Sequence, residues 1–191
     1  MTVNADSVLD VLENKAKEES NKRNQEIGQQ ELDEIGKELA KAALRFSLLK
    51  IDITNMLVFS TKESLRLDGD SGPYLLYTHA RAVSITRKVG KKEIKEYDAA
   101  LLTHTSEKEL IKEISKYSRV VKQTVETLSP KLLAIYSLKL SDKFNVFYES
   151  CQVLHAETEA LANARLALVN VFINVFSSLL DLMGITSLGK M

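Results

Sequence analysis

The sequence is poor in the residues that form cross-links and turns: its 191 residues include one cysteine, two prolines and seven glycines. A single cysteine excludes an intramolecular disulfide framework and a cysteine-rich zinc site. An all-β domain needs a turn about every ten residues, so the scarcity of glycine and proline argues against one. Apolar residues make up 45% and charged residues 27%. This composition excludes a wholly disordered chain and is typical of one globular domain.

The sequence also lacks a recognisable targeting segment. Its first 15 residues have neither the basic start nor the apolar core of a signal peptide. One stretch, residues 164–185, is apolar enough to suggest a membrane, but polar residues recur along it with spacings of four, three and four. These are Asn170, Asn174, Ser177 and Asp181. One polar stripe on an apolar helix predicts the central helix of a soluble bundle, so we expect a cytoplasmic protein with no membrane partner.

No catalytic motif can be assembled from the chain. The glycines do not have the spacing of a phosphate-binding loop, either GxGxxG or GxxxxGK[ST]. The three histidines, His79, His104 and His155, lie 25 and 51 residues apart and do not form a local metal-binding motif. Cys151 lies in an apolar stretch, which indicates a buried structural thiol rather than a nucleophile. We therefore predict no catalytic residue and no metal ligand in this chain.

Helical patterns account for most of the remaining sequence. Apolar residues recur with a helical period from Leu32 to Leu49, after a short amphipathic helix and the polar stretch 17–26. Residues 51–67 break the period and predict an irregular link. A turn at residues 68–73 places Pro73 at the start of a helix that ends at Gly90.

Three further helices complete the predicted architecture. Ser106 and Glu109 have the spacing of a capping box before one helix that continues to about residue 121. Ser129 and a following proline predict a start for a helix over 131–151, and the last helix runs over 158–183. The sum is an all-α bundle of five or six helices.

The formal net charge of zero conceals an uneven distribution. Residues 1–40 carry a net charge of −5, residues 41–100 carry +4 and residues 101–191 carry +1. The average would argue against a nucleic-acid partner, but the middle segment is basic enough to bind one.

The segment GPYLLYTHAR, residues 72–81, is the best candidate for binding. Tyr74, Tyr77 and Arg81 are three and four residues apart, which places them on one helix face. Tyrosine rings can stack on unpaired bases, and an arginine can bind a base edge or a phosphate. Basic residues that follow could contact phosphates: Arg87, Lys88, Lys91 and Lys92. The alternative is that both tyrosines pack in the core and the basic run is a solvated helix end.

Several segments resemble the C-terminal, DALR-type anticodon-binding domain of arginyl-tRNA synthetases. They are ALRFSLLK (43–50), DSGPYLLYTHAR (70–81), NARLALV (163–169) and LLDLMGI (179–185). The resemblance implies a helical bundle of the class I synthetase anticodon-binding type over residues 41–191, preceded by a helical connector over residues 1–40. The HIGH-type and KMSKS motifs are missing, so the chain is not expected to charge tRNA by itself. ATP and magnesium would act in the full-length parent, an arginine–tRNA ligase.

The resemblance also implies a partner and its contacts. The expected partner is tRNA of the arginine isoacceptors, bound by a monomer. Six residues match positions on the family's anticodon-binding surface: Tyr74, Tyr77, Arg81, Tyr148, Gln152 and Met191. Bases of a single-stranded loop can be splayed out, stacked on aromatic rings and recognised by their edges. The second hypothesis is a protein-interaction module of the same fold that does not bind RNA.

Overall fold

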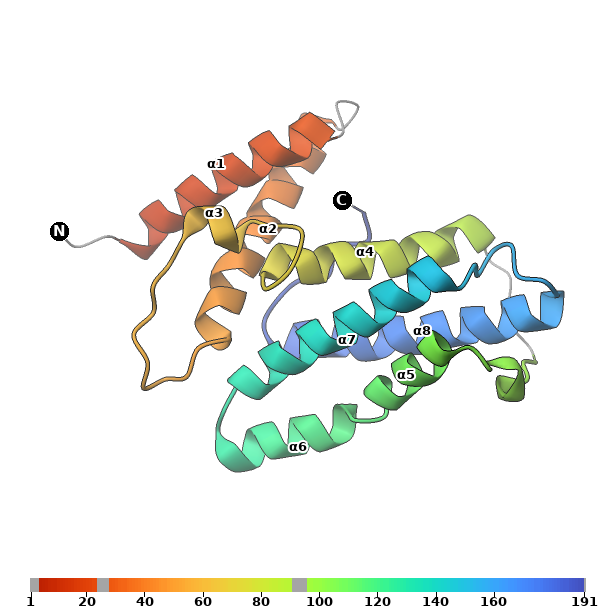
Figure 1. Ribbon diagram of the computed structural model, residues 1–191. Coiled ribbons are helices and arrows are strands. Elements are labelled where there is room, and N and C mark those ends of the chain that lie inside the picture. The colour runs from red at the N-terminus through yellow and green to blue at the C-terminus, as the bar shows by residue number, and fades with distance from the viewer. Residues whose placement is uncertain (1–3, 24–27, 91–95, 191) are drawn as a thin grey trace.

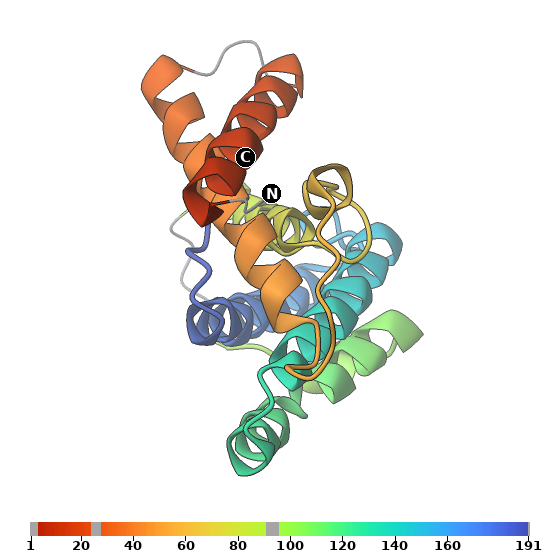
Figure 2. The same cartoon turned by 90° about the vertical axis from the view of Figure 1, so that its left-hand side faces the viewer.

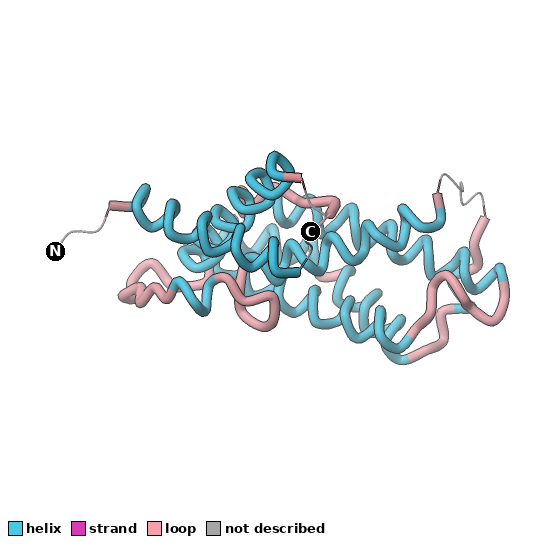
Figure 3. The backbone as a smooth tube through the Cα atoms, turned by 90° about the horizontal axis from the view of Figure 1, so that it is seen from above, coloured by secondary structure: helices cyan, strands magenta, loops and turns pink. Residues whose placement is uncertain are grey.

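A computed structural model describes residues 4–23, 28–90 and 96–190, and these residues form helices and loops without a strand (Figures 1 and 3). The helices are α1 (Ala5–Arg23), α2 (Gln29–Leu49), α3 (Thr61–Ser64), α4 (Gly72–Val89), the 3-10 helix η1 (Ala99–Leu101), α5 (Thr105–Ile114), α6 (Tyr117–Thr127), α7 (Lys131–Ser150) and α8 (Glu159–Leu182). The all-α prediction is confirmed. The link over 51–67 is irregular as expected, apart from the single turn of α3.

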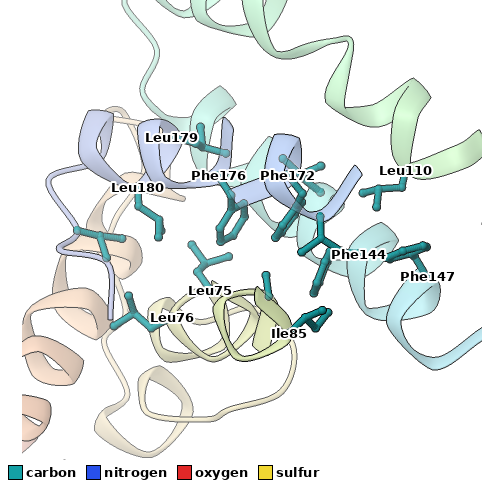
Figure 4. Packing of buried hydrophobic residues seen from close by; sticks show 14 of the residues in the cluster. Leu75, Leu76, Ile85, Leu110, Phe144, Phe147, Phe172, Phe176, Leu179 and Leu180 are labelled. Atoms are coloured by element: carbon teal, nitrogen blue, oxygen red, sulfur yellow. The ribbon is translucent and has the colours of Figure 1, made fainter. Parts of the chain in front are cut away.

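The main core lies where α4, α7 and α8 meet (Figure 4). Phe144 of α7 stacks on Phe172 of α8 with ring centroids 4.0 Å apart, and Phe176 continues the stack at 5.0 Å. Leu75 and Leu76 of α4 are fully buried against the same cluster. Burying a large apolar side chain stabilises the fold by about 1.5–3 kcal/mol, so these contacts fix α4 firmly against α7 and α8.

The start of α4 is set by its sequence. Ser71 caps the helix, because its hydroxyl accepts a hydrogen bond from the Tyr74 amide at 3.1 Å. Gly72 lies so close to α2 that a Cβ atom there would be 2.1 Å from the carbonyl oxygen of Ala42. Gly90 ends the helix with a φ of 73°, as the sequence predicted.

Helices α1 and α2 form an antiparallel pair at one end of the molecule (Figure 2). A small apolar cluster of Leu12, Ala40 and Ala43 joins them, and it is separate from the main core. The expected boundary between connector and bundle, at residues 40 and 41, lies inside the continuous helix α2. The polar stretch after residue 17 continues α1 as far as Arg23.

Two predictions about α5 are wrong. The helix is capped by His104 and Glu107, not by Ser106 and Glu109: the Glu107 carboxylate accepts from the His104 amide at 2.8 Å. The expected single helix is also divided, because α5 ends at Ile114 and α6 begins at Tyr117. At the break, the Glu113 carbonyl accepts both from the Lys116 amide at 3.1 Å and from the Tyr136 hydroxyl at 2.8 Å.

Among the described residues, α8 is the one helix that is long and apolar enough to cross a membrane. In the structure it supplies one wall of the main core, with Phe172, Phe176 and Leu180 buried. Asn170, Asn174 and Asp181 of the predicted polar stripe are exposed. The prediction of a central bundle helix is therefore confirmed.

Candidate nucleic-acid interface

Helices α4 and α7 lie side by side and bring chemically distinctive residues together (Figure 1). We call seven of them the Tyr–Arg cluster: Tyr74, Tyr77 and Arg81 from α4, and Asp142, Asn145, Tyr148 and Glu149 from α7. Four of these residues are predicted from the sequence, and the structure groups all four.

Arg81 lies at the centre of the cluster. Its guanidinium carbon is 4.4 Å from the ring centroid of Tyr148 and 5.1 Å from that of Tyr77. Its Nη1 donates to Oδ1 of Asn145 at 2.9 Å and lies 3.7 Å from the Glu149 carboxylate. The guanidinium therefore occupies one face of each ring, so a base reaches Tyr77 only on its other face or by displacing Arg81.

Asn145 connects Arg81 to Tyr74. Its amide nitrogen donates to the Tyr74 hydroxyl at 2.9 Å and to the Thr78 hydroxyl at 3.1 Å. The Tyr74 hydroxyl in turn donates to Asp142 at 2.8 Å. Since both ends of the Asn145 amide are bound, the network fixes the positions of Tyr74 and Arg81 relative to each other.

The environment of Tyr74 keeps its phenol protonated. Burial raises the pKa of Tyr74 to about 12, and the nearby Asp142 carboxylate acts in the same direction. Asn145 donates to the phenol oxygen and lowers the pKa, but by less. The phenol is thus a hydrogen-bond donor throughout the neutral range.

Three members of the cluster are not predicted from the sequence: Asp142, Asn145 and Glu149. They follow one another on α7 at spacings of three and four residues, which places them on the same face as Tyr148. That polar stripe on an otherwise apolar helix is the feature that could have identified them.

A groove beside the cluster enlarges this surface. It has a volume of about 790 Å³ and lies between α1, α2, α3 and the start of α4. Leu39, Leu65 and Pro73 give it an apolar lining, and Tyr77 borders both the groove and the cluster. Tyr77 therefore connects the groove with the cluster.

The other predicted contacts lie apart from the cluster or outside the described residues. Gln152 is exposed after α7, where its carbonyl accepts from Arg165 at 2.9 Å. Arg87 is exposed but its guanidinium donates to the Gly189 carbonyl, which ties it to the C-terminal segment. Lys88 is exposed near the end of α4. Lys91, Lys92 and Met191 lie outside the described residues.

Two of the three histidines, and the cysteine, have structural roles, whereas His155 is exposed. His79 is buried, and its ring nitrogens contact the Leu188 carbonyl at 2.9 Å and the Ser177 hydroxyl at 2.8 Å. His104 caps α5. Cys151 is buried, and burial raises the pKa of its thiol, which confirms the prediction of a structural thiol. The described residues include no group of three or more acidic, histidine or cysteine side chains placed to hold a metal ion.

Comparison with known proteins places this helical bundle in a family of domains found in aminoacyl-tRNA synthetases. Residues 75–191 match the DALR anticodon binding domain family, and the chain belongs to that family. Its curated relatives are arginine–tRNA ligases. It is 35% identical over 183 residues to the enzyme of Methanothrix thermoacetophila, and 36% identical over 189 residues to that of Methanosphaerula palustris. The alignments cover 96% and 99% of this chain and 32% and 33% of the relatives.

Solved structures agree with this assignment. The arginyl-tRNA synthetase of Thermus thermophilus superposes on the whole chain with a TM-score of 0.93 and 30% identity, and the chain covers 32% of it. The arginyl-tRNA synthetase of Plasmodium falciparum has the same fold, with a TM-score of 0.87 over 99% of this chain and 34% of its own, at 23% identity. The chain thus spans about a third of the length of these relatives.

Proposed function

We propose that the chain binds the anticodon loop of arginine-accepting tRNA through the Tyr–Arg cluster. The observation that carries the proposal is the position of Arg81 between the rings of Tyr77 and Tyr148. Aromatic rings and a planar guanidinium are the groups on which unpaired RNA bases stack, at about 1–3 kcal/mol per base. The DALR family membership of residues 75–191 supports the same partner.

The charge of the cluster indicates how it would bind. Arg81 is its single cation and lies near Glu149, and the cluster contains a second carboxylate, that of Asp142, bound to Tyr74. Stacking and base-edge hydrogen bonds therefore contribute more than phosphate neutralisation at this site. We expect the affinity to depend weakly on salt. About two counterions should be released, one each for the proposed phosphate contacts of Arg87 and Lys88.

The proposed wider role is within an arginine–tRNA ligase. There, binding of the anticodon loop would help to position the tRNA for arginylation by the catalytic part. ATP and magnesium would act in that part, and the bundle would contribute only RNA recognition. We propose that the chain acts as a cytoplasmic monomer in this role.

A binding experiment with a matched pair of variants tests the proposal. Tyr77→Leu removes an aromatic ring from the cluster, whereas Tyr97→Leu removes an exposed ring outside it. We expect Tyr77→Leu to weaken binding of an arginine isoacceptor about tenfold and Tyr97→Leu to leave it unchanged. Equal binding of arginine and non-cognate tRNA by the parent chain, together with no loss in Tyr77→Leu, would favour the protein-interaction module instead.

A further inference from the structure

A group of apolar side chains is exposed at the end of the molecule opposite to the Gly90 end of α4. The loop between α2 and α3 exposes Ile53, Met56 and Val58 by 90%, 89% and 85%. Next to it, the end of α6 exposes Leu128 by 82% and Val125 by 67%. We call these five residues the apolar end.

The two segments of the apolar end are neighbours. The loop and the turn between α6 and α7 lie side by side in both perpendicular views (Figures 1 and 2). Hydrogen bonds from Thr54 hold the pKa of Asp52 in the loop below its usual value, and the charge of Lys131, at the start of α7, acts on Asp52 in the same direction. Single exposed apolar residues are common on protein surfaces, but a group of this size marks an interaction site.

Leu128 adds a second and independent observation. Its φ of 51° places it in the left-handed region, where glycine is the usual residue at a helix end. A bulky side chain there costs conformational energy, and its exposed position returns no packing energy within this chain. A leucine in this position is explained if its side chain is buried against something else.

RNA does not fit the apolar end. Aliphatic side chains offer no ring for base stacking. Of the two lysines beside the loop, Lys50 already binds Asp70 through its ammonium at 3.0 Å, which leaves the single charge of Lys131. The chemistry that matches the apolar end is another folded apolar protein surface.

We propose that the apolar end packs against the part of an arginine–tRNA ligase that lies outside this chain. The relatives are about three times as long as the chain, so each contains a large additional region for such a contact. Contacts between domains of one protein usually bury about 600–1,500 Å², and five exposed apolar side chains form a suitable centre for one. The inference rests on the proposed role within a ligase.

Thiol labelling can test this contact directly. Cys151 is 2% exposed, so a cysteine introduced by Met56→Cys is the accessible thiol, and Asn170→Cys on the exposed side of α8 is the matched control. The probe is a shortened form of the Methanosphaerula palustris ligase. It lacks the 33% of that enzyme that aligns with this chain. We expect saturating probe to slow labelling of Met56→Cys by about tenfold or more and to leave Asn170→Cys unchanged.

Three results would overturn the inference. The first is equal labelling of Met56→Cys with and without the probe, and the second is slower labelling when tRNA is added without the probe. The third is slow labelling of the chain by itself, together with a doubled mass in sedimentation. The last would assign the surface to a second copy. A triple variant, Ile53→Ser, Met56→Ser and Val58→Ser, separates this inference from the proposed function. It should lower affinity for the probe about tenfold while tRNA binding stays unchanged, whereas failure of the proposed function would show as absence of tRNA binding in the parent chain.

Discussion

Asn145 holds Arg81 in place: Nη1 of the arginine donates to Oδ1 of the asparagine at 2.9 Å, across the contact between α4 and α7. The same asparagine donates to the Tyr74 hydroxyl. One amide therefore positions two of the residues proposed to contact RNA, although it was not itself predicted from the sequence.

Asn145→Ala should weaken both the fold and RNA binding. The Tyr74 hydroxyl and Arg81 lose a shared partner, so we expect the free energy of unfolding to fall by about 1–2 kcal/mol in urea denaturation. Affinity for arginine tRNA should fall about tenfold because Arg81 is no longer held in position. Asn170→Ala, at an exposed position on α8, is the control and should change neither quantity. A stable Asn145→Ala chain with full affinity would contradict this role.

Arg81→Lys should reduce tRNA affinity although the charge is kept. Lysine has no planar group to lie between the rings of Tyr77 and Tyr148. We expect the Kd for tRNA to rise about 3- to 10-fold, which corresponds to the loss of one or two cation–π contacts. A double-mutant cycle with Tyr148→Leu measures the coupling directly. Additive effects of the two substitutions would show that the stacking contributes nothing.

His79 should make the stability of the fold depend on pH. Its Nδ1 must carry the proton, because the Leu188 carbonyl can only accept, so Nε2 of the neutral ring accepts from Ser177. Burial lowers the pKa of His79 below its usual 6.5. The unfolded chain therefore binds a proton first as the pH falls, and the free energy of unfolding should decline between pH 6.5 and the lower pKa of the folded state.

Two substitutions divide the contacts of His79. In His79→Asn the side-chain amide can still donate to the Leu188 carbonyl. In His79→Gln the longer side chain can still bind the Ser177 hydroxyl. The free energy of unfolding of both variants is measured between about pH 5 and pH 8, a range that brackets the free histidine pKa of about 6.5. It should change less with pH than that of the parent chain. An unchanged slope in both variants would assign the dependence to other groups.

Gly72→Ala should displace α4 from α2. The added methyl group would lie 2.1 Å from the Ala42 carbonyl oxygen, and a backbone atom cannot move aside cheaply. We expect a loss of about 3 kcal/mol or more in stability, together with weaker tRNA binding because the start of α4 carries Tyr74. Gly28→Ala is the control, since no atom lies within 4 Å of its added Cβ. Similar melting temperatures for the two variants would contradict the close approach.

Leu128→Gly should stabilise the chain by about 0.5–1 kcal/mol. Glycine adopts the left-handed conformation without the cost that a leucine side chain incurs, and an 82% exposed side chain loses little packing. Thermal denaturation of the 191-residue chain measures the gain. A loss of stability would show that the leucine packs within the chain itself.

The local helix signals in the sequence were sufficient to predict α4. Pro73 and Gly90 are local features of the sequence, and the structure places Pro73 in the first turn of α4 and Gly90 at its end. The spacing of Tyr74, Tyr77 and Arg81 predicted a shared face for the same reason, since helical periodicity is a local property.

Features that depend on tertiary contacts were not predictable in this way. The division between α5 and α6 leaves the apolar period intact, and the hydroxyl that binds the Glu113 carbonyl there comes from Tyr136, which is remote in sequence. Glu109 has capping spacing, but it pairs with Lys143 at 3.2 Å instead. The role of Asn145 likewise depends on the packing of α7 against α4, which no pattern within α7 determines.

The C-terminal segment is bound back onto the body of the protein. The carbonyls of Leu188 and Gly189 accept hydrogen bonds from His79 and Arg87 of α4, and Lys190 pairs with Glu31 of α2 at 3.1 Å. Any affinity tag or fluorophore fused after Lys190 would therefore emerge against these two helices and compete with the contacts that hold the segment. Fusions for purification or imaging are better made on the N-terminal side of α1, where Asn4 is exposed and forms no such tie to α4 and α2.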